Sequence, residues 1–169
     1  MGCCVMRVER KSMMPELKKV LRALDKGTVV VGIAGSDAEA THDGSPINMA
    51  ALGYIFEHGA PEINMPARPW LIPGIESVRD QIAKALAKGA TDAFATLKPE
   101  PAFGALDKVG QIAQGAIRER IAGGIAPALS ERTIYARMHR KKNRRSAGGM
   151  TPLIDTGDFV KRINYVVKR

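Results

Sequence analysis

Two short runs of strand-forming residues lie near opposite ends of the chain and constrain the fold that it can adopt. Residues 28–33 are β-branched except for Gly32, and residues 163–167 form a second run centred on Tyr165. Residues of this kind favour β-strands. The two runs can pair only if the C-terminus returns to residues 28–33. The sequence therefore predicts an α+β fold, with several helices packed on a small antiparallel or mixed sheet.

Apolar residues at helical spacing fill much of the sequence outside these two runs. They predict five helices, of which the third, residues 75–97, is long and amphipathic. Pro99 and Pro101 are expected to break the third helix, and Ser130 is expected to cap the fifth. Residues 35–46 are rich in Gly, Ser, Asp and Thr and predict a loop. The predicted helices begin near Pro15, Ile47, Ile75, Leu106 and Glu131.

The length of 169 residues fits one domain. We expect residues 1–14 to be a flexible N-terminal arm and residues 15–169 to form a single α+β domain with a basic mobile loop at about 137–150. The two cysteines, Cys3 and Cys4, are neighbours, so no disulfide framework is expected and a reducing cytoplasm is the natural compartment. No apolar run is long enough for a membrane span, so we expect no membrane partner.

The chain is strongly basic, with a formal net charge of +9. Such a charge indicates an anionic partner: a nucleic acid, an acidic protein or a membrane surface. The cations concentrate in residues 137–145, which could form a solvated mobile loop, contact DNA phosphates or meet an acidic neighbouring protein. No Phe, Tyr or Trp is interspersed there for base stacking, which disfavours a reader of single strands. The run contains Arg137, Arg140, Lys141, Lys142, Arg144 and Arg145.

Nothing in the sequence has the spacing of a catalytic or metal site, and we expect neither enzymatic activity nor a cofactor. His42, His58 and His139 lie on unrelated segments without paired ligand spacing. Residues 31–35 lack the lysine and the spacing of a phosphate-binding loop. No serine stands in a nucleophile elbow.

Residues 66–71, Pro-Ala-Arg-Pro-Trp-Leu, form a rigid segment. Pro66 and Pro69 hold their neighbours extended, and Trp70 is expected to pack on the core with its indole N–H bonded near the rim. Arg68 has two interpretations. It either pairs with Glu57 or a carbonyl at a helix end, or it makes a contact with another subunit or with DNA.

Residues 152–157, Pro-Leu-Ile-Asp-Thr-Gly, predict a tight turn that returns the last strand to the sheet. The side chains of Asp155 and Thr156 can bond nearby backbone N–H groups, and Gly157 can adopt a positive φ. Asp158 can then cap a short helical turn. A metal-binding or general-base role for Asp155 is the less favoured alternative.

Three elements of the sequence, taken in order, resemble the virion morphogenesis family of tailed bacteriophages, the neck or tail-completion proteins. The first joins residues 54–59, Tyr-Ile-Phe-Glu-His-Gly, to residues 66–71. The second lies within residues 129–134, and the third is residues 152–159. The motif positions of the resemblance are Glu57, Gly59, Pro66, Pro69, Asp155, Thr156 and Gly157.

The resemblance implies a structural, non-enzymatic virion protein at the head–tail junction, assembled in the bacterial host cytoplasm. It implies a homo-oligomeric ring, a hexamer or dodecamer, that joins the head connector or head-closure protein to the tail terminator or tube. Packaged double-stranded DNA would pass through that ring. The alternative is a small basic protein that binds double-stranded DNA as a monomer or dimer. The candidate interface or DNA-channel residues are Arg68, Trp70, Arg137, Arg140, Lys141, Lys142, Arg144 and Arg145.

Overall fold

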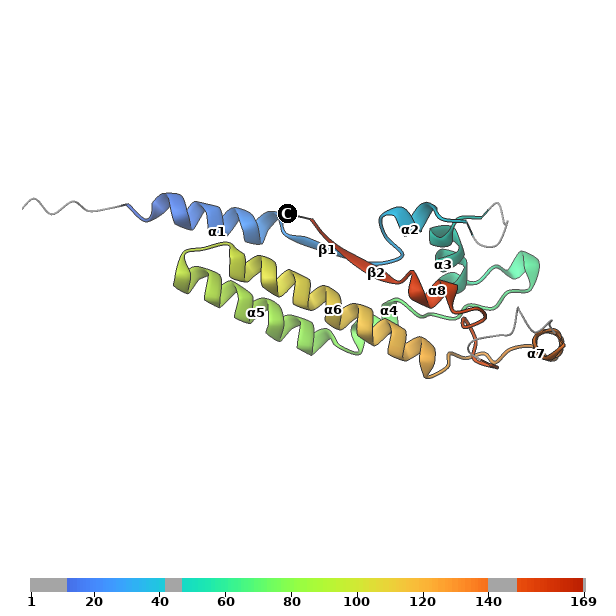
Figure 1. Cartoon of the computed structure of the whole chain (residues 1–169). Helices are drawn as coiled ribbons and strands as arrows, with labels where there is room; N and C mark the ends of the chain where they lie inside the picture. Colours follow the sequence, from blue (N-terminus) through green and yellow to red (C-terminus); the bar gives the residue numbers. More distant parts are fainter. Residues whose placement is uncertain (1–11, 42–46, 140–148, 169) are drawn as a thin grey trace, which may run out of the picture.

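The computed structural model describes residues 12–41, 47–139 and 149–168. The molecule is elongated: a long helical hairpin lies beside a layer made of one helix and a two-stranded sheet, and short helices gather at one end (Figure 1). The α+β class predicted from the sequence is confirmed. Most of the expected arm, residues 1–11, and most of the expected basic loop, residues 140–148, lie outside the described residues.

The two predicted strands pair with each other, which confirms the expected return of the C-terminus. They are β1 (Thr28–Gly32) and β2 (Asn164–Lys168), and they run antiparallel. In their register Val31 lies opposite Tyr165, and Val30 lies opposite Val166. Neighbouring residues of a strand point to opposite faces. These two pairs therefore belong to different faces of the sheet.

One face of the sheet packs on α6 (Glu100–Ala122), and the other is open. The ring of Tyr165 lies against Gly110 of α6, at a distance that leaves no room for a side chain at that position. On the opposite face Val30 and Val166 are 38% and 37% exposed. Both strands are therefore held to the molecule through α6.

The hairpin consists of α5 (Arg79–Thr96) and α6, which approach each other through small residues. Gly89 of α5 lies against Ala105 of α6, and Ala93 is completely buried. Because Gly and Ala carry so little side chain, the two helix backbones can lie close together over this stretch. The result is the most extensive contact between two helices in the described structure.

The expected third helix, residues 75–97, is two helices, which corrects the prediction. It divides at Ser77 into α4 (Ile72–Glu76) and α5. Gly74 of α4 lies directly on Ile117 of α6, where a Cβ atom would be 3.1 Å from the Ile117 Cα. The backbone leaves the helical conformation at Val78, with a φ of −116° and a ψ of 15°, and the helical periodicity of the sequence does not reveal this break.

The fourth helix also begins earlier than predicted, at Glu100 rather than near Leu106. Pro99 precedes it and Pro101 lies in its first turn. Proline is tolerated in a first turn, because the N–H that it lacks would have no partner inside the helix. The two prolines do separate α5 from α6, but they also start α6.

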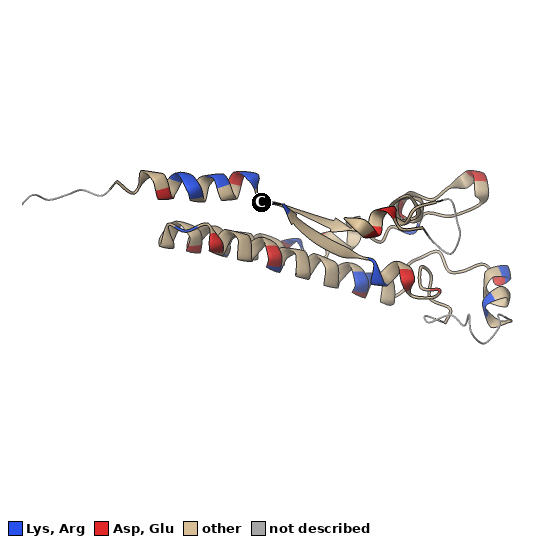
Figure 2. Ribbon diagram, turned by 45° about the horizontal axis from the view of Figure 1, so that its top comes forward, with Lys and Arg blue, Asp and Glu red and all other residues tan. Residues whose placement is uncertain are grey.

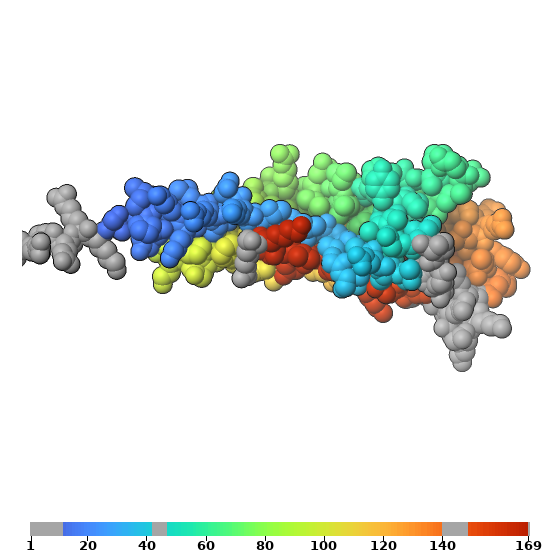
Figure 3. Space-filling model, turned by 90° about the horizontal axis from the view of Figure 1, so that it is seen from above, coloured from blue at the N-terminus to red at the C-terminus, as the bar shows by residue number. Residues whose placement is uncertain are grey.

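The first helix, α1 (Met14–Lys26), buries only part of its apolar surface. Pro15 lies in its first turn, as predicted, and Val20 packs on the hairpin with none of its surface exposed. Met14 and Leu21, on the adjoining side of the helix, are 55% and 49% exposed. Seen from above, α1, the sheet and α2 follow one another along the length of the molecule (Figure 3).

Short helices surround the end of the molecule opposite α1. Ser130 accepts a hydrogen bond from the backbone N–H of Thr133 at 3.3 Å, so the predicted cap of the fifth helix is confirmed. The predicted loop at residues 35–46 contains one helical turn. These elements are α2 (Ser36–Glu39), α3 (Met49–His58), η1 (Pro61–Ile63), α7 (Glu131–Met138) and α8 (Asp158–Lys161).

The main core lies where these short helices meet α6. Ile117 and Ile121 of α6 are fully buried there, and the ring of Phe159 meets the ring of Trp70 edge to face at 5.1 Å. The core therefore joins the C-terminal turn to α3 and α6. Its buried members are Met49, Trp70, Ile117, Ile121, Ile125, Phe159 and Ile163.

Gly110→Ala is expected to lower the free energy of unfolding by about 1–3 kcal/mol, because the new methyl group would overlap the Tyr165 ring. Gly115→Ala is the matched control on the same helix, since nothing lies within 4 Å of its Cβ position. The control should raise stability by about 0.5–1 kcal/mol, because Ala is the better helix former. Urea unfolding followed by circular dichroism measures both. Equal stability of the two variants would contradict the packing of β2 on α6.

Candidate functional site

The three elements of the resemblance, which are far apart in the sequence, line one cavity of about 540 Å³. The cavity lies at the end of the molecule where α3, α7 and α8 gather (Figure 1). Its floor is apolar, and its charged lining consists of two arginines and two aspartates. The sequence identified these elements as separate turns and caps, and the structure brings them together.

The buried carboxylate of Glu57 holds the first element in place. Glu57 lies in the last turn of α3 and is only 8% exposed. It accepts hydrogen bonds from the backbone N–H groups of Trp70, Leu71 and Ile72 at 2.7, 2.8 and 3.2 Å. These groups lie at the start of α4, which has no side-chain cap of its own. Glu57 thus satisfies N–H groups that would otherwise have no partner inside the helix.

Trp70 fixes the same segment from the side of the core. It is 3% exposed, and its indole N–H donates to the carbonyl oxygen of Gly53 at 3.1 Å. The expected burial and indole hydrogen bond are therefore confirmed. With so little surface exposed, Trp70 supports the cavity wall from behind, and it cannot itself make a surface contact with a partner.

The turn before this segment requires glycine. Gly59 has a φ of +79°, and a Cβ atom there would lie 2.7 Å from the backbone nitrogen of Ala67. A side chain would therefore be strained in conformation and would also push residues 66–71 away from α3. On the other side, Nε of Arg120 donates to the carbonyl oxygen of Pro69 at 3.0 Å and ties the segment to α6.

Arg68 bridges from this segment to the connection between α6 and α7. Its Nε donates to the carbonyl oxygen of Pro127 at 2.9 Å, and its Nη2 donates to that of Ala128 at 3.1 Å. These carbonyl groups lie in the connection rather than at the end of a helix. Glu57 is not the partner of Arg68, because the Glu57 carboxylate accepts hydrogen bonds from the backbone N–H groups at the start of α4 instead.

The charge of Arg68 is not balanced within the described part of the chain, where no carboxylate forms an ion pair with it. Partial burial lowers the pKa of its guanidinium, and the nearby positive charge of Arg137 lowers this pKa further. The desolvation and the repulsion both disfavour the charged form. A negative group placed beside Arg68 would relieve the repulsion.

Arg137 belongs to the interior of this corner. Its side chain is 8% exposed, and its Nε lies 3.7 Å from Oδ1 of Asp155. Its Nη1 donates to the carbonyl oxygens of Gly149, Thr151 and Ile154 at 3.0, 3.0 and 2.9 Å. The sequence grouped Arg137 with the basic surface run, but the structure uses its guanidinium to join α7 to residues 149–155.

The third element is a turn that leads into α8, whose N-terminus has no side-chain cap. Leu153 and Gly157 have φ angles of +64° and +83°, and the hydroxyl of Thr156 accepts from the N–H of Asp158 at 3.4 Å. The positive φ of Leu153 is unusual for a residue with a side chain. Asp155, which lies between Leu153 and Gly157 in the turn, supplies the carboxylate that faces Arg137. This turn positions α8 beside the cavity.

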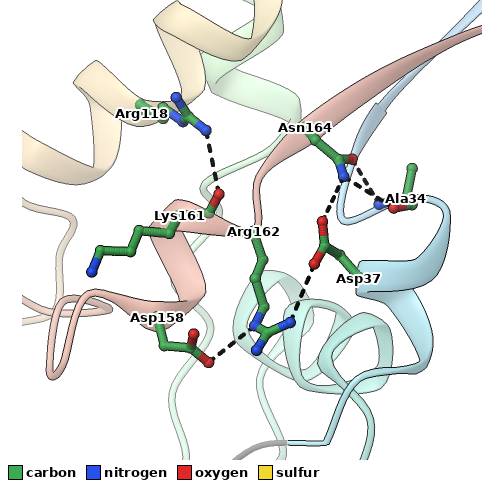
Figure 4. A network of polar contacts seen from close by, with 7 residues as sticks. All are labelled: Ala34, Asp37, Arg118, Asp158, Lys161, Arg162 and Asn164. Atoms are coloured by element: carbon green, nitrogen blue, oxygen red, sulfur yellow. Dashed lines mark hydrogen bonds and ion pairs between the residues drawn. The ribbon is translucent and has the colours of Figure 1, made fainter.

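A polar network beyond the turn connects α8 with α2 and β2 (Figure 4). Arg162 contacts Asp158 at 3.1 Å and Asp37 at 3.2 Å, and Asn164 donates to Asp37 at 2.9 Å and to the carbonyl oxygen of Ala34 at 3.1 Å. The side-chain hydrogen bond to Asp158 is the main cause that raises the pKa of Arg162. This network was not predicted from the sequence. Only the i, i+4 spacing of Asp158 and Arg162 could have indicated it.

The remaining candidate cations, Arg140, Lys141, Lys142, Arg144 and Arg145, lie outside the described residues. The described structure has another basic surface that the sequence analysis missed, on α1. Figure 2 shows basic residues along this helix. The sequence could have indicated this basic surface, because four cations lie on the polar side of a predicted amphipathic helix. These exposed residues are Lys18, Lys19, Arg22 and Lys26.

Within residues 12–41, 47–139 and 149–168, no group of three or more His, Cys, Asp or Glu side chains could hold a metal ion. In the same ranges, no helix combines the length and the apolar character needed to cross a membrane. Comparison of the chain with models of known protein families, with curated proteins and with solved structures finds no match.

Glu57→Gln is expected to lower the free energy of unfolding by about 1.5–3 kcal/mol, because it removes the negative charge and replaces one of the two acceptor oxygens with an NH₂ group that cannot accept a backbone N–H. Glu62→Gln, at an exposed position of η1, is the control and should change stability by less than about 0.5 kcal/mol. Urea unfolding measures both. If Glu57→Gln were as stable as the control, Glu57 would not be the cap of this segment.

Proposed function

We propose that the chain is a structural subunit of the head–tail junction of a tailed bacteriophage, a neck or tail-completion protein. Its copies form a homo-oligomeric ring, a hexamer or a dodecamer, that joins the head connector to the tail terminator or tube. The ring surrounds the DNA channel and is assembled in the bacterial host cytoplasm. The observation that carries the proposal is the convergence of the three family-like elements on one cavity.

The contacts around that cavity favour a binding surface over a catalytic centre. Glu57, Arg68 and Arg137 each hold backbone groups of a distant segment in a fixed position. The hydroxyl of Ser130 lies 2.9 Å from the hydroxyl of Thr133, and such a pair lacks the base that an activated nucleophile requires. A surface of fixed shape is what a protein needs if it works by assembly.

Apolar side chains exposed at both ends of the molecule also support assembly. On α1, Leu21 and Leu24 are 49% and 36% exposed. At the other end, Tyr54, Ile63 and Tyr135 are 66%, 64% and 65% exposed. Tyrosine is enriched in protein interfaces. A ring subunit meets neighbours on more than one side and requires surfaces of this kind.

The second candidate function is a small basic protein that binds double-stranded DNA as a monomer or dimer. The four exposed cations on α1 and the run at residues 140–145 favour it. The two candidate functions differ in whether the chain binds other protein subunits or free DNA first. A ring subunit assembles with protein and meets DNA only in its channel, whereas a DNA-binding protein binds free duplex tightly.

Leu21→Asp is expected to reduce ring formation without unfolding the chain, because Leu21 lies on the uncovered side of α1. Mass photometry and electron microscopy of the purified protein, alone and with the purified head connector, should show rings of about six or twelve copies for the wild type. Gln81→Asp, exposed at the far end of α5 from α1, is the control and should assemble normally. A wild-type protein that stays monomeric in both settings would contradict the proposal.

Replacing Arg140, Lys141, Lys142, Arg144 and Arg145 by Gln is expected to weaken contact with DNA. For the wild type we expect a Kd for free duplex of about 10⁻⁴–10⁻⁶ M at physiological salt, with steep salt dependence and no sequence preference. Replacing Lys18, Lys19, Arg22 and Lys26 by Gln tests whether α1 contributes. Fluorescence anisotropy with a labelled duplex measures the affinities. Nanomolar binding by a monomer or dimer would favour the DNA-binding alternative.

A further inference from the structure

We propose that the cavity between α3, α7 and α8 binds a short segment of a partner protein in which a carboxylate side chain stands next to an apolar one. The inference rests on the proposed function in that the partner belongs to the same assembly. It is carried by the charges of the cavity walls and by the composition of its floor.

Of the two cations among the described residues that line the cavity, Arg68 is the one that no described carboxylate contacts. Asp155 faces Arg137 at 3.7 Å, and Asp158 contacts Arg162 at 3.1 Å. Arg68 is bonded to two backbone carbonyl oxygens, and among the described residues it has no carboxylate partner. A carboxylate brought by a partner would supply the missing charge through a charge-assisted hydrogen bond.

The floor of the cavity suits an apolar side chain beside that carboxylate. Phe56 and Phe159 meet there edge to face, with 5.1 Å between their ring centroids, and Leu52 and Leu153 pack around them. The volume of about 540 Å³ lies within the range of pockets that enclose small ligands. It fits a short peptide segment and not a folded domain.

The same walls disfavour a nucleic acid in this position. Asp155 and Asp158 both line the cavity, and their carboxylates would repel a run of several phosphates more strongly than a single carboxylate placed beside Arg68. Phe159 is 6% exposed, so its ring is not available for a base to stack on. A phosphate-rich ligand is expected to bind instead to a basic surface away from the cavity, such as the one on α1.

A displayed library of random heptapeptides, selected on the purified full-length protein, tests the chemistry of the occupant. We expect enrichment of peptides in which Asp or Glu is adjacent to Leu, Ile, Met or Phe. Absence of enrichment, or enrichment of basic or purely apolar peptides, would overturn the proposal. Enriched peptides that reproduce a segment of this chain would also overturn it, in favour of a second copy as the occupant.

Variants then locate the binding of a synthetic peptide taken from that selection, measured by fluorescence anisotropy. Arg68→Gln should weaken it at least about tenfold, and Arg68→Lys, which keeps the charge, should weaken it less. Arg79→Gln, an exposed arginine of α5, is the control. Thermal unfolding of each variant shows whether the connection at Pro127 and Ala128 has kept its fold.

Ile63 provides a test that does not depend on Arg68. It lines the rim of the cavity and is 64% exposed, so substitution there leaves the core intact. Ile63→Asp should weaken binding of the acidic peptide, and Ile63→Lys should preserve or strengthen it. Equal affinity of the two Ile63 variants would overturn the proposal, as would unchanged affinity in Arg68→Gln.

The two proposals fail in different ways. If the protein forms rings with the head connector, but Arg68→Gln and Ile63→Asp form them as readily as wild type, the cavity proposal is wrong and the proposed function stands. If acidic and apolar peptides bind through Arg68 but no ring forms with any junction protein, the proposed function is wrong and the peptide site stands.

Discussion

The carboxylate of Glu57 is the interaction on which the arrangement around the cavity depends. This carboxylate accepts hydrogen bonds from three successive backbone N–H groups, and it thereby joins the end of α3 to the start of α4. The start of α4 in turn places Gly74 on Ile117 of α6, and α6 carries both strands of the sheet. One buried acceptor thereby links the short helices at the cavity end to the hairpin that runs the length of the molecule.

Local patterns in the sequence were enough to predict the elements of the fold and the pairing of its two strands. The two strand-forming runs predicted β1 and β2, and the cap at Ser130 predicted the start of α7. The break at Ser77 was not predictable from periodicity, because apolar residues continue at helical spacing across it, while Gly74 just before it packs directly on α6. The start of α6 was missed for a different reason: a proline that ends one helix can also occupy the first turn of the next.

The candidate site was predicted only in part, because the role of an arginine depends on what the fold places beside it. Trp70 was correctly expected in the core. Arg137 belongs to a basic run in the sequence, yet it is 8% exposed and bonded to three carbonyl oxygens. Arg68 is bonded to two backbone carbonyl oxygens and forms no ion pair with a carboxylate of the described structure. A formal net charge of +9 therefore does not show which cations are available to a partner.

The position of the chain in a particle tests the account most directly. Electron microscopy with gold-labelled antibody, applied to tailed bacteriophage particles produced in a host that expresses this chain, can locate it within the particle. The account predicts label at the junction between head and tail of complete particles. Absence of the chain from such particles, with the protein found on host DNA instead, would contradict it.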